Sequence, residues 1–219
     1  MKRILEPELM LDEHQVMAYA QSDFEIPHQD FMRRLSTWVN EPNFSGTALD
    51  LGCGPGDISY RFAKTFPLCT LHAVDGSSPM LNIAQAALSS DLAPRLRFIQ
   101  GMLPTVILPQ SDYEIIFSNS VLHHLPDPQA LWQTVKNYAK SGTRIIIMDL
   151  LRPANLALAQ KMVKDYTVNE PEVLQRDFYH SLLAAFSLEE ISTQLAKADL
   201  QLQLEQISDR HVFITGVIR

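Results

Sequence analysis

Residues 48–57 carry the sequence Ala-Leu-Asp-Leu-Gly-Cys-Gly-Pro-Gly-Asp. A short apolar run ends in an acid, three glycines follow at alternate positions, and helix-compatible residues come next. This pattern predicts a strand, a tight turn and a helix over roughly Asp57–Phe66. Glycine has no Cβ and adopts positive φ readily, so a turn of this kind lets a ligand contact bare backbone.

The ligand that suits this turn is a nucleoside without phosphates. A dinucleotide-binding turn has a third glycine at the position that Asp57 occupies here. An acid caps the start of a helix well, but it places negative charge where a pyrophosphate would meet the helix dipole. No Gly-Lys-Ser or Gly-Lys-Thr follows, which argues against a phosphate-binding loop. S-adenosylmethionine (SAM) fits because its sulfonium is a cation and Asp50 is expected on the loop.

Two stretches carry a resemblance to a known family. Residues 48–59 resemble motif I of the class I SAM-dependent methyltransferases, and residues 71–81 resemble the second strand of that family, with Asp75 as its terminal acid. The resemblance covers about residues 46–151. It implies an α/β fold with a seven-stranded, mostly parallel sheet, helices on both faces and an antiparallel last strand.

The whole chain, residues 1–219, is expected to form a single methyltransferase domain. Within it, residues 1–45 are expected to be an N-terminal helical lid and residues 153–186 a helical insertion. The patterns of apolar, turn and capping residues predict the following further elements: one or two helices over 8–40, divided at Pro27; strands at 69–74, 96–99, 112–117 and 144–150; helices at 79–88, 127–138, 153–167 and 187–198; a stretch at 170–176; and a terminal antiparallel pair at 200–207 and 211–218.

Composition limits the partners and the compartment. Lys and Arg number 18 against 25 Asp and Glu, a net charge of −7, and no basic run exceeds two residues. DNA, RNA and anionic membranes are therefore poor partners. The two cysteines, Cys53 and Cys69, do not form a disulfide framework, so reduced thiols and a cytoplasmic location are expected. The N-terminus lacks the apolar core of a signal peptide, and no apolar run reaches membrane-spanning length.

Asp75 is the predicted ribose ligand. It lies at the carboxyl end of the strand next to the glycine turn, where a ribose diol can donate two hydrogen bonds to a carboxylate. The alternative is that Asp75 caps the helix that begins near Pro79, although Ser77 or Ser78 can supply that cap. The resemblance and this geometry together predict a cofactor site formed by Tyr19, Asp50, Gly52, Cys53, Gly54, Asp75, Gly76, Met80, Gly101, Met102, Leu103, Asn119 and Ser120.

The adenine end and the ammonium end of this site are both expected to use backbone groups. Many family members carry an acid that holds the adenine amino group, and this chain has Met102 there. We expect the backbone amides of Met102 and Leu103 to bind the adenine edge, with the Met102 side chain packing on the ring. The resemblance implies that backbone carbonyls at the end of the fourth strand take the methionyl ammonium, and Asn119 and Ser120 are the candidates.

The paired histidines His123 and His124 are candidates for a general base, or else groups that pack or position a helix. In a helical turn adjacent residues point about 100° apart, so at most one is expected to face the pocket. Neither is predicted to bind a metal ion, because adjacent histidines do not easily close on one ion and no Glu or His partner is spaced nearby in the sequence.

Accessory segments offer further candidates. Tyr179 and His180 lie where this fold commonly inserts acceptor-binding structure, and they either orient or deprotonate an acceptor or serve as packing residues. Tyr19, Phe24 and His28 either hang over the ligand turn as a lid or cover one edge of the sheet.

The predicted function is methyl transfer from SAM to a small-molecule acceptor by in-line displacement, with catalysis that is mainly positional. The acidic composition and the aromatic accessory segments favour a small, lipophilic acceptor over nucleic acid. Two alternatives stay open. One is a SAM-binding module without catalysis, suggested by Met102. The other is a nicotinamide-dependent oxidoreductase, which Asp57 opposes.

Overall fold

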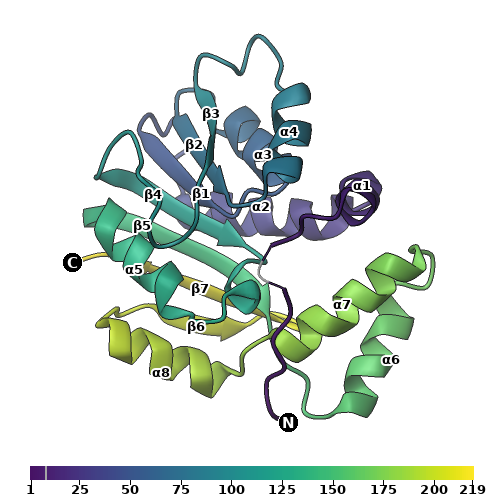
Figure 1. The fold of residues 1–219 in the computed structure, drawn as a ribbon. Coiled ribbons are helices and arrows are strands. Elements are labelled where there is room, and N and C mark those ends of the chain that lie inside the picture. Colours follow the sequence, from purple (N-terminus) through teal and green to yellow (C-terminus); the bar gives the residue numbers. More distant parts are fainter. Residues whose placement is uncertain (8) are drawn as a thin grey trace.

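The computed structural model describes residues 1–7 and 9–219. In the described chain, strands form one seven-stranded sheet in the order β3-β2-β1-β4-β5-β7-β6 (Figure 1). Neighbours from β3 to β5 are parallel, and β7 is antiparallel to both β5 and β6. The predicted fold class is confirmed. The strands are β1 (Thr47–Leu51), β2 (Thr70–Asp75), β3 (Leu96–Gln100), β4 (Tyr113–Asn119), β5 (Ala139–Leu150), β6 (Gln203–Gln206) and β7 (His211–Val217).

Helices cover both faces of the sheet, and this explains the unbroken apolar runs in the central strands. Consecutive residues of β4 illustrate the arrangement, because Ile116 and Phe117 are both fully buried but belong to different apolar clusters on opposite faces. The helices are α1 (Glu13–Gln21), α2 (Glu25–Val39), α3 (Asp57–Thr65), α4 (Ser78–Ala86), the 3₁₀ turn η1 (Leu122–His124), α5 (Gln129–Tyr138), α6 (Leu156–Tyr166), α7 (Glu172–Ala184) and α8 (Leu188–Ala198). Residues of α2, α3 and α4 build the first cluster, and residues of α5 and α8 build the second.

Two helix starts follow the predicted capping chemistry. The Ser77 side chain accepts a hydrogen bond from the Met80 N–H at the start of α4. Ser187 and Glu190 form a reciprocal capping box at the start of α8. Asp75 is therefore not needed as the cap of α4.

Several element boundaries differ from the sequence-based prediction. Pro27 does not divide the leading helices but lies in the first turn of α2, where its missing N–H leaves no intrahelical hydrogen bond unmade. Strand β5 begins at Ala139 instead of Arg144, directly after α5, and includes Gly142 with φ of +92°. Strand β6 has only four residues, Gln203–Gln206.

The segment between β5 and α8 is largely helical, as expected for residues 153–186. Residues 172–184 form one continuous helix, α7, which includes the residues from Asp177 onward. α6 and α7 pack on each other around a small cluster that includes Met162 and Leu182. In Figure 1 this pair lies beside the carboxyl end of the sheet, on the side where the chain begins.

The first residues of the expected helical lid are not helical. Residues 1–7 form neither helix nor strand, and they run past α7 before the chain reaches α1 (Figure 1). Ile4 donates its N–H to the carbonyl of Leu183 at 3.0 Å, which attaches this segment to the end of α7. No helix in the described part of the chain combines the length and the hydropathy needed to cross a membrane.

Candidate functional site

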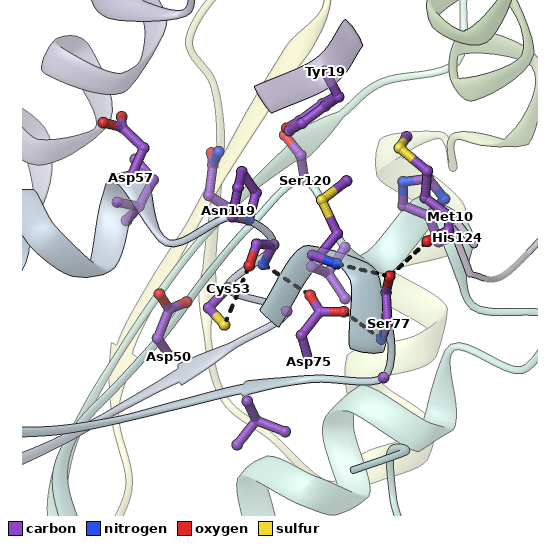
Figure 2. Close-up of a pocket in the computed structure, with 18 of the residues that line it drawn as sticks. Met10, Tyr19, Asp50, Cys53, Asp57, Asp75, Ser77, Asn119, Ser120 and His124 are labelled. Atoms are coloured by element: carbon purple, nitrogen blue, oxygen red, sulfur yellow. Dashed lines mark hydrogen bonds between the residues drawn. The ribbon is translucent and has the colours of Figure 1, made fainter. Parts of the chain in front are cut away.

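A cavity of about 290 Å³ lies at the carboxyl ends of β1, β2 and β4. The chain order of the strands reverses between β1 and β4, and open α/β sheets bind ligands at such a switch point. All the residues predicted to hold the cofactor line this cavity: Tyr19, Asp50, Gly52, Cys53, Gly54, Asp75, Gly76, Met80, Gly101, Met102, Leu103, Asn119 and Ser120. Figure 2 shows how several of these side chains surround one space.

The turn after β1 gives the cavity a floor of bare backbone. Gly52 has φ of +78°, and an added Cβ would lie 2.0 Å from Cγ2 of Val121. Gly54 has φ of +52°, and no described atom would lie within 4 Å of its Cβ although the residue lines the cavity. Gly52 is therefore required for packing within the protein, whereas Gly54 leaves space that a ligand can occupy.

Asp75 connects the turn to the end of β2. Its Oδ2 accepts the N–H of Gly54 and its Oδ1 accepts the N–H of Ser77, both at 2.8 Å, and Figure 2 shows these bonds. Burial raises the pKa of this carboxyl, and the backbone hydrogen bonds oppose the rise. Each oxygen keeps a lone pair for a further donor, as a ribose diol would require.

Asp50 lies in β1 and not on the loop, which corrects the prediction, although it still lines the cavity. The side chain is almost fully buried, and Oδ2 accepts a hydrogen bond from the Ser59 hydroxyl. Burial raises its pKa to about 7, and nearby Asp75 adds to the rise. Asp50 therefore changes charge near neutral pH.

The end of β4 presents an unsatisfied acceptor. Oδ1 of Asn119 is buried and has no hydrogen-bond partner among the described residues, and Asn119 lines the cavity. The next residue, Ser120, has φ of +60°, an uncommon conformation for a residue with a side chain. A buried amide oxygen without a partner is suited to a ligand N–H donor.

On the side of the cavity next to β3, two glycines are closely approached by neighbouring side chains. A Cβ on Gly76 would lie 2.6 Å from Sδ of Met102, and one on Gly101 would lie 2.3 Å from Cγ2 of Val106. The Met102 side chain is about a third exposed. Gly76 therefore allows Met102 to approach the end of β2, and Gly101 allows the approach of Val106; neither glycine by itself indicates a ligand.

Aromatic residues from α1 and from the start of α2 line the same cavity as the glycine turn. The rings of Tyr19 and Phe24 are 4.8 Å apart, and those of Phe24 and His28 are 5.4 Å apart. All three residues line the cavity. Burial raises the pKa of Tyr19 to about 12, so its phenol is neutral at physiological pH.

Asp57 attaches α2 to the start of α3. Its Oδ2 is 2.6 Å from Nδ1 of His28 and 2.7 Å from Nε of Arg61. Burial alone would raise the pKa of Asp57, but the hydrogen bonds from His28 and Arg61 outweigh it and lower the pKa to about 2. Arg61 also pairs with Glu25. Asp57 is thus an anion with two partners, in addition to its place in the first turn of α3.

The two histidines of η1 are in different surroundings. His124 lines the cavity, whereas His123 is buried behind it with Nδ1 2.7 Å from Oδ1 of Asp149. Burial lowers the pKa of His123, but the charge and hydrogen bond of Asp149 outweigh this and raise it. Burial, together with His123, lowers the pKa of His124 to about 3. The expectation that at most one of the pair faces the pocket agrees with this geometry.

An acidic residue lies near this pair in three dimensions, although no Glu or His partner is spaced nearby in the sequence. Glu6 comes from the start of the chain, and its Oε1 lies 3.3 Å from Nδ1 of His124 and 3.6 Å from Nε2 of His123. No sequence signal connects Glu6 with a motif more than a hundred residues away.

Tyr179 and His180 are not among the described residues that line the cavity. Tyr179 packs against the cluster between α6 and α7, and His180 is exposed. Because α7 is a regular helix, the residues that follow Asp177 are distributed around its faces.

Residues of the extended N-terminal part were missed as site residues. Leu9 and Met10 line the cavity, and the Met10 carbonyl accepts a hydrogen bond from the Ser77 hydroxyl at 2.6 Å (Figure 2). Val121 and Leu125 of the η1 region line it as well. These residues show no periodicity and carry no motif role of their own, so the sequence alone provided no signal that they line the cavity.

Comparison with known proteins shows the family of the chain. Residues 44–203, most of the chain, match the family model described as a methyltransferase domain. The chain therefore belongs to the class I SAM-dependent methyltransferase family. An uncharacterized methyltransferase of Mycobacterium tuberculosis is 29% identical over 106 residues, which are 48% of this chain and 51% of that protein.

Other relatives extend this comparison. A trans-aconitate 2-methyltransferase of Deinococcus radiodurans is 30% identical over 124 residues, 57% of this chain and 44% of that protein. The chain spans about half the length of the curated relatives it matches. A SAM-dependent methyltransferase from Aquifex aeolicus has the same fold, with a TM-score of 0.72 at 16% identity over 96% of this chain and 100% of the other.

Proposed function

We propose that this protein transfers a methyl group from SAM to a small-molecule acceptor. The observation that carries the proposal is the Asp75 carboxylate, held by two backbone N–H groups beside the open backbone of Gly54. This combination at a switch point suits a sugar diol. The turn itself, residues 52–57, contains no Lys or Arg that could pair with a phosphate. The family assignment supports the same cofactor.

The chain's residues fit the parts of SAM. Asp75 would hold the ribose, the backbone at Met102 and Leu103 would hold the adenine edge, and Asn119 with Ser120 would receive the methionyl ammonium. The partnerless oxygen of Asn119 supports the last assignment. When bound, SAM supplies the electrophilic methyl group.

Catalysis by this chain is proposed to be mainly positional. Tyr19, Phe24 and Met10 cover the cavity and exclude water from a bound cofactor and acceptor. Holding two reactants in line contributes about 7 to 11 kcal/mol to lowering a barrier. His124 is the η1 imidazole that faces the cavity, and we propose that it contacts the acceptor.

The accessory assignments belong to the same proposal. We propose that residues 1–219 act as one domain in which residues 1–45 and 153–186 form the walls around the acceptor. The composition supports a small-molecule partner, no nucleic-acid partner and a cytoplasmic location.

Cofactor binding can be tested by calorimetric titration with S-adenosylhomocysteine. Asp75→Asn should weaken binding at least about tenfold, because each hydrogen bond to a charged group contributes about 1.5 to 3 kcal/mol. Asp91→Asn, at an exposed position, is the matched control and should bind like the wild type. Unchanged affinity in Asp75→Asn would show that the ribose site is misplaced. Tighter binding of NAD than of S-adenosylhomocysteine would favour an oxidoreductase.

A second candidate is a SAM-binding module without catalysis, which is favoured by the side chain of Met102 at the position where many family members carry an acid. Incubation with methyl-labelled SAM and a metabolite extract separates the two. Transfer of label to a product supports the enzyme. Binding of S-adenosylhomocysteine without any labelled product supports the module.

A further inference from the structure

Three potential metal ligands meet beside the cavity, and one of them, His124, lines it. One oxygen or nitrogen atom from each of Glu6, His123 and His124 lies within 4.8 Å of the other two. Oε1 of Glu6 is 3.3 Å from Nδ1 of His124 and 3.6 Å from Nε2 of His123. Ligand atoms bound about 2.0 to 2.1 Å from a tetrahedral zinc ion lie roughly 3.3 Å apart. The two Glu6 separations are therefore close to those of a bound site.

The geometry also removes the objection that adjacent histidines cannot share an ion. The two rings lie with their centroids 4.2 Å apart and 35° between their planes. They present different atoms toward Glu6, Nε2 from His123 and Nδ1 from His124. Nε2 is farther from the backbone than Nδ1, and both ring nitrogens lie within 3.6 Å of Oε1 of Glu6 although the two residues start from different positions on η1.

Two of these atoms are unsatisfied. Oε1 of Glu6 and Nδ1 of His124 are buried and have no hydrogen-bond partner among the described residues, even though they are 3.3 Å apart. The Glu6 side chain is only 8% exposed. Buried polar atoms without partners are uncommon and call for an explanation such as an ion.

Neighbouring side chains form hydrogen bonds to His123 and Glu6, as outer-shell residues do in metal sites. Nδ1 of His123 is bonded to Asp149, the carboxylate–histidine arrangement that leaves Nε2 free for a metal ion. The other oxygen of Glu6 accepts a hydrogen bond from the Ser181 hydroxyl at 3.2 Å. The guanidinium of Arg3 lies near the carboxylates of Glu6 and Asp149, but its N–H groups are directed to backbone carbonyls.

We propose that Glu6, His123 and His124 bind a divalent transition-metal ion, with Asp149 as the residue that orients His123. Two imidazoles and one carboxylate form a ligand set used by catalytic zinc sites and by non-haem iron(II) sites, both of which keep an open position. His124 is the ligand that lines the cavity, so the site lies next to the cavity. The proposal does not depend on the assignment of SAM.

The test is metal binding by the full-length protein after treatment with a chelator. Competition with a chromogenic zinc indicator should show one zinc ion per chain. Glu6→Gln and His124→Gln should each weaken zinc binding at least about tenfold, because loss of even an outer-shell partner costs 10- to 100-fold. The matched controls are Glu13→Gln and His180→Gln, at exposed positions, and both should bind zinc like the wild type. Titration with iron(II) under anaerobic conditions distinguishes the preferred metal.

Further measurements show whether the variants remain folded and where the ion binds. Cobalt(II) in the site should give visible absorption of four-coordinate N and O ligation, and this absorption should be absent in Glu6→Gln. Calorimetric titration with S-adenosylhomocysteine should give the same affinity for Glu6→Gln and the wild type, which establishes an intact fold. Substoichiometric zinc binding by the wild type would overturn the proposal, as would unchanged zinc affinity in Glu6→Gln and His124→Gln.

Discussion

Two glycines in the turn after β1 have different roles: Gly52 permits packing within the protein, and Gly54 leaves space for a ligand. Gly52 and Gly54 both have positive φ, but only the Cβ position of Gly52 is occupied by another side chain, that of Val121. Gly54 faces open space in the cavity. Identical residue types two positions apart should therefore respond differently to the same substitution.

Gly52→Ala should destabilise the fold by about 2 to 4 kcal/mol, since left-handed strain of about 1 to 2 kcal/mol is combined with overpacking against Val121. Urea unfolding followed by circular dichroism measures this. Gly142→Ala is the matched control, because Gly142 also has positive φ but no described atom within 4 Å of its Cβ position. It should cost only the strain, and equal losses in the two variants would contradict the explanation.

Gly54→Ala should separate stability from binding. The free energy of unfolding should fall by only about 1 to 2 kcal/mol, the strain of the positive φ. The affinity for S-adenosylhomocysteine should fall at least about tenfold, because the new methyl group occupies the cavity floor and overpacking typically costs about 1 to 3 kcal/mol. Calorimetric titration measures the affinity, and wild-type affinity would show that the cofactor does not approach Gly54.

Asp50 should make the ligand-free protein less stable as pH rises. In the unfolded chain its carboxyl ionises near 3.8, and burial raises the folded-state pKa to about 7. The folded state therefore holds a proton that the unfolded state has lost between these values, and stability decreases as pH rises through this range. At 1.36 kcal/mol per pKa unit the full effect is up to about 4 kcal/mol.

Asp50→Asn should remove this dependence, because the amide stays neutral and its oxygen can still accept the Ser59 hydrogen bond. The variant should be more stable than the wild type at pH 8 and nearly equal to it at pH 4. Thermal unfolding across this pH range measures the difference. A stability difference that does not grow with pH would mean that Asp50 ionises normally in the folded protein.

At the level of secondary-structure elements, Arg3 makes several of the contacts that attach the N-terminal segment. Arg3 donates hydrogen bonds to the carbonyls of Ala184, His123 and Leu125, and its guanidinium lies 3.9 Å from the centre of the Phe186 ring. These contacts hold the segment that carries Glu6 against η1 and α7. The N-terminal segment, which is neither helix nor strand, is thus held in place by contacts with η1 and α7.

Arg3→Gln should loosen this segment. Losing hydrogen bonds from a charged group to several carbonyls costs about 1 to 3 kcal/mol, and the Ile4 N–H, which is bonded to Leu183, should exchange faster with solvent. Hydrogen exchange of peptides from residues 1–12, read by mass spectrometry, measures the change. Lys2→Gln is the control at an exposed neighbour. Equal exchange in both variants would show that Arg3 does not anchor the segment.

For the whole molecule, the charges around the cavity bear on the acceptor. Carboxylates at Glu25, Asp57 and Asp75 line it, and Arg61 is already paired with Glu25 and Asp57. Among the described lining residues, no guanidinium or ammonium is left without an acidic partner. A polycarboxylate acceptor would meet like charges here, unlike a neutral or cationic one.

Trans-aconitate should therefore be a poor acceptor, although some relatives are trans-aconitate methyltransferases. We expect methyl transfer to it to be at least about 100-fold slower than to the best neutral or cationic acceptor, because like charges brought together cost several kcal/mol. Formation of S-adenosylhomocysteine across an acceptor panel measures the rates. Comparable turnover with trans-aconitate would contradict this description of the cavity.

The amino-acid sequence by itself indicated the strand-turn-helix around Gly52 and Gly54 and the position of Asp75 at the end of a strand, and its resemblance to the family implied the mostly parallel sheet. The first two features depend on local causes: positive φ at glycine, an apolar run buried on both faces, and a short spacing between adjacent strands. Most of the residues predicted for the cofactor site lie at or just after strand ends and line the cavity for that reason, whereas Tyr19 and Met80 lie in helices.

Only the tertiary structure decided which distant groups surround the cavity. Glu6 reaches His123 and His124 through an extended segment, whereas Tyr179 and His180 lie on a regular helix that directs them elsewhere. Contacts between residues more than a hundred positions apart depend on how complete elements pack, and they leave no periodicity or spacing in the chain. Asp50 shows the same limit, because its pKa near neutrality follows from burial that its residue type does not reveal.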